Sequence, residues 1–144
     1  MNEPVLDLGS LCKALASLEG AIEIVSASAW FDRQPANLQN TLIAGVVQNF
    51  EFVYELSIKM LRRRIEMDSS SPAEIDAASF KDLLRIAGEK GLIADVEAWF
   101  RYRRMRTLTS HTYDREKAMA IYRDTPAFIG DARALLAALE ARNG

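Results

Sequence analysis

Apolar residues recur along most of the chain at intervals of three and four positions, the spacing that places them on one face of an α-helix. One series falls at Leu8, Leu11, Leu15, Leu18, Ile22, Val25 and Ala29. A second falls at Leu38, Leu42, Val46, Phe50, Val53 and Met60 or Leu61. Each series predicts a long helix with one buried stripe. The sequence has no Asn-Gly or Asp-Gly hairpin signal between segments in which apolar and polar residues alternate, so we expect no strands.

Capping and helix-breaking residues divide the rest of the chain. The string Ser71-Pro72-Ala73-Glu74 has the form of a capping box, so it predicts the start of a third helix that ends near Gly88 or Gly91. Asp95 is a candidate cap for a fourth helix over about 96–107, and Asp114 or Thr112 for a fifth. Thr125-Pro126 either kinks or restarts the last segment.

These elements predict an all-α protein. We expect an up-down bundle of five to six helices, two of them long and antiparallel, because short loops favour antiparallel neighbours. The chain has 144 residues, which suits one domain with a sizeable core. No internal repeat and no second domain is apparent, so residues 1–144 are expected to form a single helical domain.

Composition narrows the function classes. The formal net charge is −2, which argues against a generally basic nucleic-acid-binding surface but not against a local one. With one cysteine and no cluster of metal-ligand spacing, we expect no disulfide, no metal site and no cofactor. No apolar run approaches the length of a membrane span, and the first residues do not have the pattern of a signal peptide. We therefore expect a cytoplasmic protein that does not enter a membrane.

The only histidine, His111, lies in a polar turn predicted between the fourth and fifth helices. Arg103, Arg104 and Arg106 precede it on the last turns of the fourth helix. One interpretation is structural, because cations suit the negative end of a helix dipole. The other is chemical, because an imidazole can move a proton near neutral pH and a guanidinium can neutralise a phosphate. Arg106 and Arg104 are both candidate partners of His111.

An Arg–His pair can cleave RNA without a metal ion. The imidazole removes the proton of a ribose 2′-hydroxyl, which attacks the adjacent phosphate while the guanidinium stabilises the crowded anion. One histidine supplies one proton relay, so the second would come from water or from a second subunit.

Two strings in the chain resemble those of a known family. Residues 105–114, Met-Arg-Thr-Leu-Thr-Ser-His-Thr-Tyr-Asp, resemble the Arg-x4-His-x-Tyr signature of the HEPN superfamily, in the branch named nucleotidyltransferase substrate-binding proteins. Residues 50–56, Phe-Glu-Phe-Val-Tyr-Glu-Leu, are similar to that family's Phe-Glu-Phe-x-Tyr-Glu-Leu helix. The resemblance extends over roughly residues 10–140.

The resemblance implies a single HEPN-like helical domain over residues 1–144 that forms a homodimer and pairs with a minimal nucleotidyltransferase. In characterised members of the superfamily the HEPN protein is an RNase toxin, and the nucleotidyltransferase is the antitoxin that transfers AMP to the tyrosine. The resemblance therefore implies that Arg106 and His111 are catalytic and that Tyr113 accepts AMP. A bulky anion on Tyr113 would repel an RNA phosphate from His111.

One position departs from the family pattern. The family usually has Asn or another strongly polar residue directly after the arginine, and this chain has Thr107. A hydroxyl lacks the paired donor and acceptor of an amide. The alternative function is therefore a non-catalytic subunit that presents substrate or nucleotide to the nucleotidyltransferase.

Other side chains carry two interpretations each. Glu51 and Glu55 either face the cleft or form an exposed salt-bridged face with Lys59. Arg62–Arg64 is either a solvated helix end or, with Arg101–Arg106, a phosphate-tracking patch across a dimer. We count Arg104, Thr107, Glu51 and Glu55 as supporting or RNA-binding candidates. The aromatic series Phe50, Phe52 and Tyr54 could stack a base, but its spacing favours core packing for Phe50.

Overall fold

The computed structural model describes residues 5–144, and every regular element among them is helical. The elements in order are α1 (Gly9–Ser26), α2 (Ser28–Phe31), α3 (Ala36–Met67), α4 (Pro72–Asp76), α5 (Phe80–Glu89), α6 (Val96–Thr107), the short 3₁₀ helix η1 (Thr109–His111) and α7 (Arg115–Arg142). The all-α prediction is confirmed. The described part has seven α-helices rather than five to six, because α2 and α4 are separate elements of one turn or little more.

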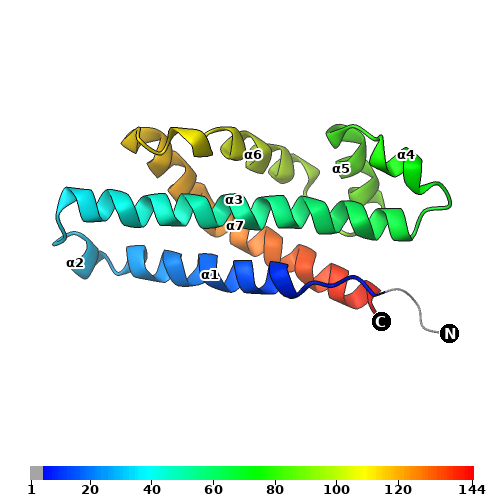
Figure 1. The fold of residues 1–144 in the computed structure, drawn as a ribbon, viewed down its shortest axis with the longest axis horizontal. Coiled ribbons are helices and arrows are strands. Elements are labelled where there is room, and N and C mark those ends of the chain that lie inside the picture. The colour runs from blue at the N-terminus through cyan, green and yellow to red at the C-terminus, as the bar shows by residue number, and fades with distance from the viewer. Residues whose placement is uncertain (1–4) are drawn as a thin grey trace.

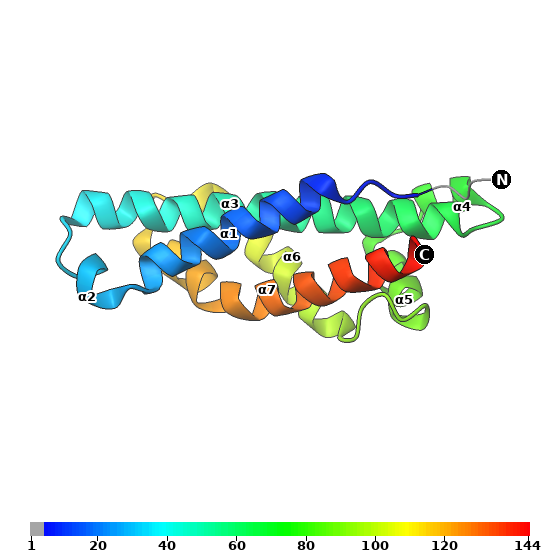
Figure 2. The ribbon, with the colours of Figure 1, turned by 90° about the horizontal axis from the view of Figure 1, so that it is seen from below.

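Three long helices form the framework (Figure 1). α1 and α3 run antiparallel, as predicted, and α7 crosses below α3, packing against both of them (Figure 2). α4, α5 and α6 lie on another side of α3 (Figure 1). α3 is central because apolar residues occupy more than one side of it, and its fully buried members include Ile43, Val46, Phe50, Val53, Leu61 and Ile65.

An aromatic cluster fills the space where α3, α6 and α7 meet. Phe128 lies at its centre, and its ring makes edge-to-face contacts with Phe50, Tyr102 and Trp99 at centroid distances of 4.7, 5.0 and 5.9 Å. Such pairs add stabilisation beyond that of burial alone. The Tyr102 hydroxyl donates to Asp131, which satisfies the one polar atom of that ring. The cluster fixes α6, and with it the segment that follows.

Two predicted helix starts are confirmed by their side-chain caps. Asp95 Oδ1 accepts a hydrogen bond from the Ala98 amide at 3.1 Å. Asp114 Oδ1 accepts from the Glu116 and Lys117 amides at 3.0 and 3.4 Å. Each carboxylate also lies at the positive end of the helix dipole. The chain reversal between α6 and α7 is therefore set by local sequence.

The predicted capping box at Ser71 is wrong. Ser71 makes no side-chain cap, and the helix it precedes, α4, ends at Asp76. The longer helix, α5, starts at Phe80, where the Ser79 hydroxyl accepts from the Asp82 amide at 3.2 Å. α5 ends as predicted near Gly91, whose φ of +75° is a left-handed conformation that glycine adopts without strain.

Pro126 lies inside α7, which continues without interruption from Arg115 to Arg142. Proline has no amide hydrogen, so the carbonyl four residues earlier, at Tyr122, loses its helical donor. The neighbouring Thr125 hydroxyl donates to the Ile121 carbonyl at 2.8 Å. Of the two alternatives, a restart is excluded, because Thr125 and Phe128 on either side of the proline are buried in one helix.

The three consecutive arginines of α3, residues 62–64, differ in exposure and in their contacts, so they do not form one solvated run. Arg63 is exposed, and Arg62 donates to the Ile75 carbonyl at 3.0 Å, which holds the α4 segment. Arg64 is only 6% exposed. The predicted solvated helix end is thus wrong for Arg64.

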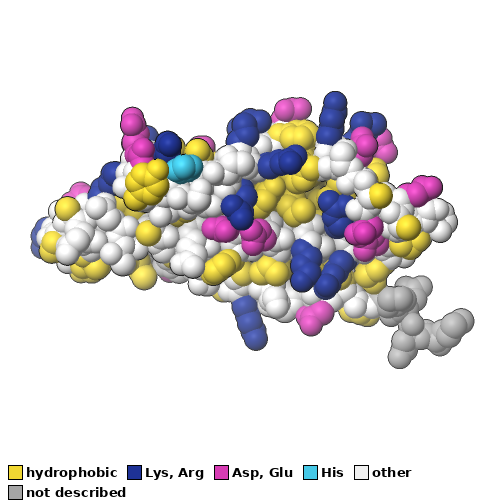
Figure 3. Space-filling model, turned by 45° about the horizontal axis from the view of Figure 1, so that its top comes forward, with side chains coloured by type: hydrophobic (Ala, Val, Ile, Leu, Met, Phe, Trp, Pro, Cys, Tyr) yellow, Lys and Arg dark blue, Asp and Glu magenta, His cyan; other side chains and the backbone are white. Residues whose placement is uncertain are grey.

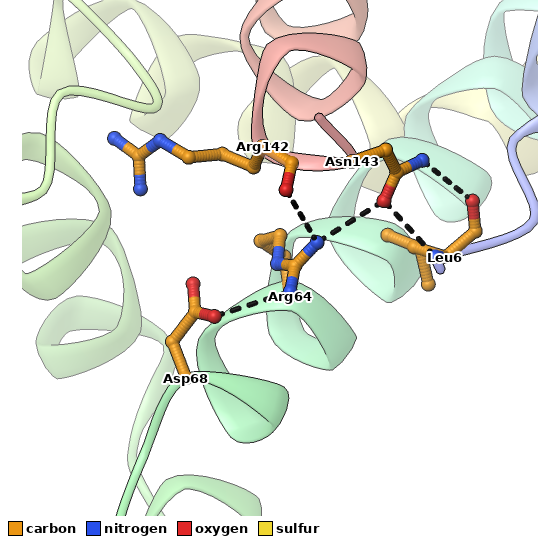
Figure 4. A network of polar contacts seen from close by, with 5 residues as sticks. All are labelled: Leu6, Arg64, Asp68, Arg142 and Asn143. Carbon is orange, nitrogen blue, oxygen red and sulfur yellow. Dashed lines mark hydrogen bonds and ion pairs between the residues drawn. The ribbon is translucent and has the colours of Figure 1, made fainter. Parts of the chain in front are cut away.

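Arg64 belongs to a polar cluster that joins the two ends of the described chain (Figure 4). Its Nη1 donates to Asn143 Oδ1 at 3.1 Å and its Nη2 to Asp68 Oδ1 at 3.1 Å. Asn143 in turn bonds both backbone groups of Leu6, accepting from its amide at 3.0 Å and donating to its carbonyl at 2.9 Å. We call this the Arg64–Asn143 clamp.

None of the described helices is both long and apolar enough to cross a membrane.

Candidate functional site

The candidate residues lie where α6 ends and α7 begins. Arg106 is on the last turn of α6, His111 ends η1, and Tyr113 directly precedes the capping residue of α7. The His111 amide donates to the Leu108 carbonyl at 3.0 Å, and the His111 carbonyl accepts from the Asp114 amide at 3.0 Å. These turns form the predicted reversal and fix the backbone on both sides of the histidine.

Arg106 is bound on three sides by residues of its own chain. Its Nε and Nη2 donate to Glu55 Oε1 at 3.0 and 2.7 Å. Its Nη2 also lies 3.1 Å from Glu51 Oε1, and its Nη1 donates to Thr109 Oγ1 at 3.1 Å. Both glutamates therefore bind Arg106, and neither sequence interpretation foresaw this pairing.

Three of the five N–H groups of the Arg106 guanidinium donate hydrogen bonds, two to Glu55 and one to Thr109. Glu51 adds an ion pair at Nη2 without a hydrogen bond. The carboxylates of Glu51 and Glu55 and the Arg106 guanidinium together carry a net charge of −1. The hydrogen bond to Glu55 also raises the pKa of Arg106 above its ordinary value. An arriving phosphate must therefore compete with the carboxylates for this side chain.

His111 contacts Tyr113 within the same turn. Its Nδ1 lies 3.2 Å from the Tyr113 hydroxyl, and the two rings meet edge to face at a centroid distance of 5.8 Å. His111 is half-buried and reaches the surface, where it is the cyan side chain of Figure 3. Because the phenol faces Nδ1, Nε2 is the ring nitrogen that remains for a substrate.

Arg104 and Thr107 lie outside these contacts. Both are exposed, and the Thr107 hydroxyl donates to the Arg104 carbonyl at 2.6 Å, within the same helix. Among residues 5–144, no hydrogen bond joins His111 to Arg104 or to Arg106. Within the described residues, Arg106 is hydrogen-bonded to Glu55 and Thr109, and His111 contacts Tyr113.

Sequence reasoning missed two groups next to Arg106. Threonine is common in turns, so Thr109 was expected to serve only the turn. Nothing in the sequence indicated that its hydroxyl accepts a hydrogen bond from the guanidinium of Arg106. Tyr54 is buried, and burial raises the pKa of its hydroxyl to about 12, an effect that Arg103 and Arg106 oppose. Of the aromatic series, Phe50 is in the core as predicted and Phe52 is half exposed.

The described residues include no group of three His, Cys, Asp or Glu side chains placed to hold a metal ion.

Two matches, both from Haemophilus influenzae, are similar to this chain. One, named Probable ribonuclease HepT, is 49% identical over 138 residues, which cover 96% of this chain and 94% of that protein. The other is a solved structure described as the fold of a substrate-binding domain of a nucleotidyltransferase. It has 48% sequence identity and a TM-score of 0.91, and the match covers 93% of this chain and 99% of that one.

A family model described as nucleotidyltransferase substrate binding protein like matches residues 6–141. That span includes α1 to α6, all of α7 except Arg142, the Arg106 contacts and the His111–Tyr113 turn. The resemblance inferred from the two sequence strings is confirmed. The chain belongs to the family of nucleotidyltransferase substrate-binding-like proteins.

Proposed function

We propose that this protein is an endoribonuclease that cleaves RNA with Arg106 and His111 and needs no metal ion for the chemistry. The observation that carries the proposal is the polar site at the α6–α7 junction. There a guanidinium is held in one orientation by Glu51, Glu55 and Thr109, and the imidazole reaches the surface a few residues away. The similarity to a probable ribonuclease supports the same reaction.

The proposed step is an internal transesterification. His111 Nε2 takes the proton of a ribose 2′-hydroxyl, and the 2′-oxygen forms a bond to the adjacent phosphorus. The bond from phosphorus to the 5′-oxygen breaks, and that oxygen leaves with a proton from water or from a second histidine. The products are a 2′,3′-cyclic phosphate and a 5′-hydroxyl. Arg106 stabilises the charge on the crowded phosphate.

A homodimer would complete the site. Within one chain Arg106 makes four contacts with acceptors and none with His111. If two α6–α7 junctions face each other, the imidazole of one subunit meets the guanidinium of the other, and a phosphate can bind between them. Two histidines would then also supply both proton transfers.

The proposed partner is a minimal nucleotidyltransferase that inactivates the RNase by modifying Tyr113. The Tyr113 side chain is 83% exposed, so a second enzyme can reach its hydroxyl. In the transfer, the phenolic oxygen bonds to the α-phosphorus of ATP, pyrophosphate leaves, and the phenolic proton is released. The resulting phosphodiester adds a negative charge beside His111 and displaces the contact at Nδ1. The pair would act as toxin and antitoxin.

The test uses the purified protein and a labelled RNA in EDTA. We expect cleavage that leaves cyclic phosphate ends, and His111→Ala should abolish both cleavage and growth arrest on expression. A matched control is Arg101→Ala against Arg106→Ala, since both are arginines of α6 and only Arg106 contacts the glutamates. Equal toxicity of the parent and His111→Ala proteins would refute the proposal.

The modification is tested separately by intact mass after incubation with the partner and ATP. The mass should increase by one AMP in the parent and remain unchanged in Tyr113→Phe. A parent protein that accepts AMP yet never cleaves RNA would leave the non-catalytic, substrate-presenting role as the function.

A further inference from the structure

A hollow of about 430 Å³ lies next to the Arg106 contacts. Its lining comes mainly from one face of α3, at positions three and four apart: Tyr54, Glu55, Ile58, Lys59 and Arg63. Asp76 of α4 closes the far side. Figure 3 views the side of the molecule that carries α4, α5 and α6, where basic side chains border an exposed apolar area.

The hollow begins at the candidate active site. Glu55 lines it and also accepts the shortest of the Arg106 hydrogen bonds, at 2.7 Å. The Tyr54 hydroxyl lies close enough to Arg103 and Arg106 to interact electrostatically with both. A phosphate held at Arg106 would thus place the neighbouring nucleotide of the same strand at the mouth of this hollow.

The lining has a separate chemical group for each part of a nucleotide. Lys59 and Arg63 are exposed cations suited to phosphate oxygens. Ile58 and the Tyr54 ring offer an apolar surface for a base. Glu66 and Asp76 are acceptors for ribose hydroxyls or base amino groups. The volume is at the lower end of small-ligand sites, which suits one nucleotide and excludes a folded RNA helix.

We propose that this hollow is the subsite for the nucleotide next to the cleaved phosphate of single-stranded RNA, with Lys59 and Arg63 binding the backbone beyond it. The inference rests on the proposed ribonuclease function. It adds that substrate length and affinity depend on the α3 face as well as on the α6–α7 junction.

The experiment compares two double variants, each of which removes one exposed lysine and one exposed arginine. The Lys59→Ala, Arg63→Ala double variant removes these two cations from the proposed subsite. Lys81→Ala with Arg85→Ala removes the same charges from α5, which lines a different hollow. Both are made in a His111→Ala background so that the RNA stays intact. The probe is a short, unstructured, fluorescein-labelled oligoribonucleotide, and its anisotropy gives Kd over a range of salt concentrations.

We expect the α3 variant to bind roughly tenfold more weakly at low salt. Its slope of log K against log salt should fall by about 1.4, because each phosphate contact to a single strand contributes about 0.7. The α5 variant should keep the affinity and slope of the His111→Ala protein. Equal losses in the two variants, or no loss in either, would overturn the subsite.

Failure of the proposed function has a different signature. If the protein with His111 intact does not cleave RNA while binding still depends on the α3 face, the nuclease assignment falls and the subsite stands. If the His111→Ala protein binds no RNA at any salt concentration, both fall.

Discussion

Replacing Asn143 by alanine tests whether the Arg64–Asn143 clamp contributes to stability. The substitution removes three hydrogen bonds, two to Leu6 at 3.0 and 2.9 Å and one from Arg64 Nη1 at 3.1 Å. It also leaves Arg64, which is 6% exposed and whose Nε has no partner, with two acceptors: Asp68 Oδ1 at 3.1 Å and the Arg142 carbonyl at 3.4 Å.

The expected cost follows from these contacts. A neutral hydrogen bond contributes about 1 kcal/mol and one to a charged group about 1.5–3 kcal/mol. Leu6 itself is buried, but its two hydrogen bonds with Asn143 are only partly buried, so water can replace part of what they contribute. We therefore expect a loss of about 2–4 kcal/mol in the free energy of unfolding. For a chain of this size each kcal/mol lowers Tm by about 2–4 °C, so a fall of roughly 4–16 °C is expected.

Urea unfolding followed by circular dichroism measures the loss, and Asn37→Ala is the matched control. The Asn37 side chain is exposed and accepts only from the adjacent Leu38 amide, at 2.9 Å. Its replacement should change stability by about 0.5 kcal/mol or less. If Asn143→Ala costs no more than Asn37→Ala, the clamp does not stabilise the fold and the reasoning is refuted.

Three further outcomes are expected. Phe128→Ala should cost about 3–5 kcal/mol in urea unfolding, because it opens a cavity among buried aromatic rings; a cost below 1 kcal/mol would mean that the cluster is loosely packed. Glu55→Gln should tighten RNA binding several-fold at low salt, since it removes one of the two carboxylates that are paired with Arg106. Unchanged affinity in a salt titration would contradict this. The pKa of Tyr54 is raised from 10.0 to about 12, so the folded state favours the protonated phenol, and the stability this gives is present below pH 10 and lost as pH rises to about 12. Tyr54→Phe should therefore lose less stability than the parent between pH 9 and 11; parallel losses would exclude Tyr54 as a source.

The features that could be predicted from sequence are those set by neighbouring residues. Asp95 and Asp114 cap helices through amides two and three residues away, so their role depends on little else. Ser71 and Ser79 show the limit of such reasoning. Each precedes an acidic residue by three positions, at Glu74 and Asp82, and only the second serine bonds the helix. A helix begins after each serine, but the local sequence does not say which one uses its side chain as a cap.

The contacts that could not be predicted join residues far apart in the chain. Glu55 and Arg106 are 51 positions apart, and Arg64 and Asn143 are 79 apart. Helical spacing places Glu55 on the same face as Lys59, but it does not say which helix will pack opposite. At Pro126 the sequence left a kink and a restart open, and the structure excludes the restart. A residue that breaks helices in isolation is kept inside α7 because the buried side chains around it hold the helix together.

The clamp also brings the first described residues beside the end of α7. Leu6 and Asn143 are hydrogen-bonded, so Leu6 lies next to the C-terminal end of the chain. A short glycine linker could join these two segments, and new ends could be opened in the mostly exposed segment 32–35 between α2 and α3. Such a circular permutant would keep every helix-to-helix contact. It would also place α3, with both glutamates that bind Arg106, first along the chain.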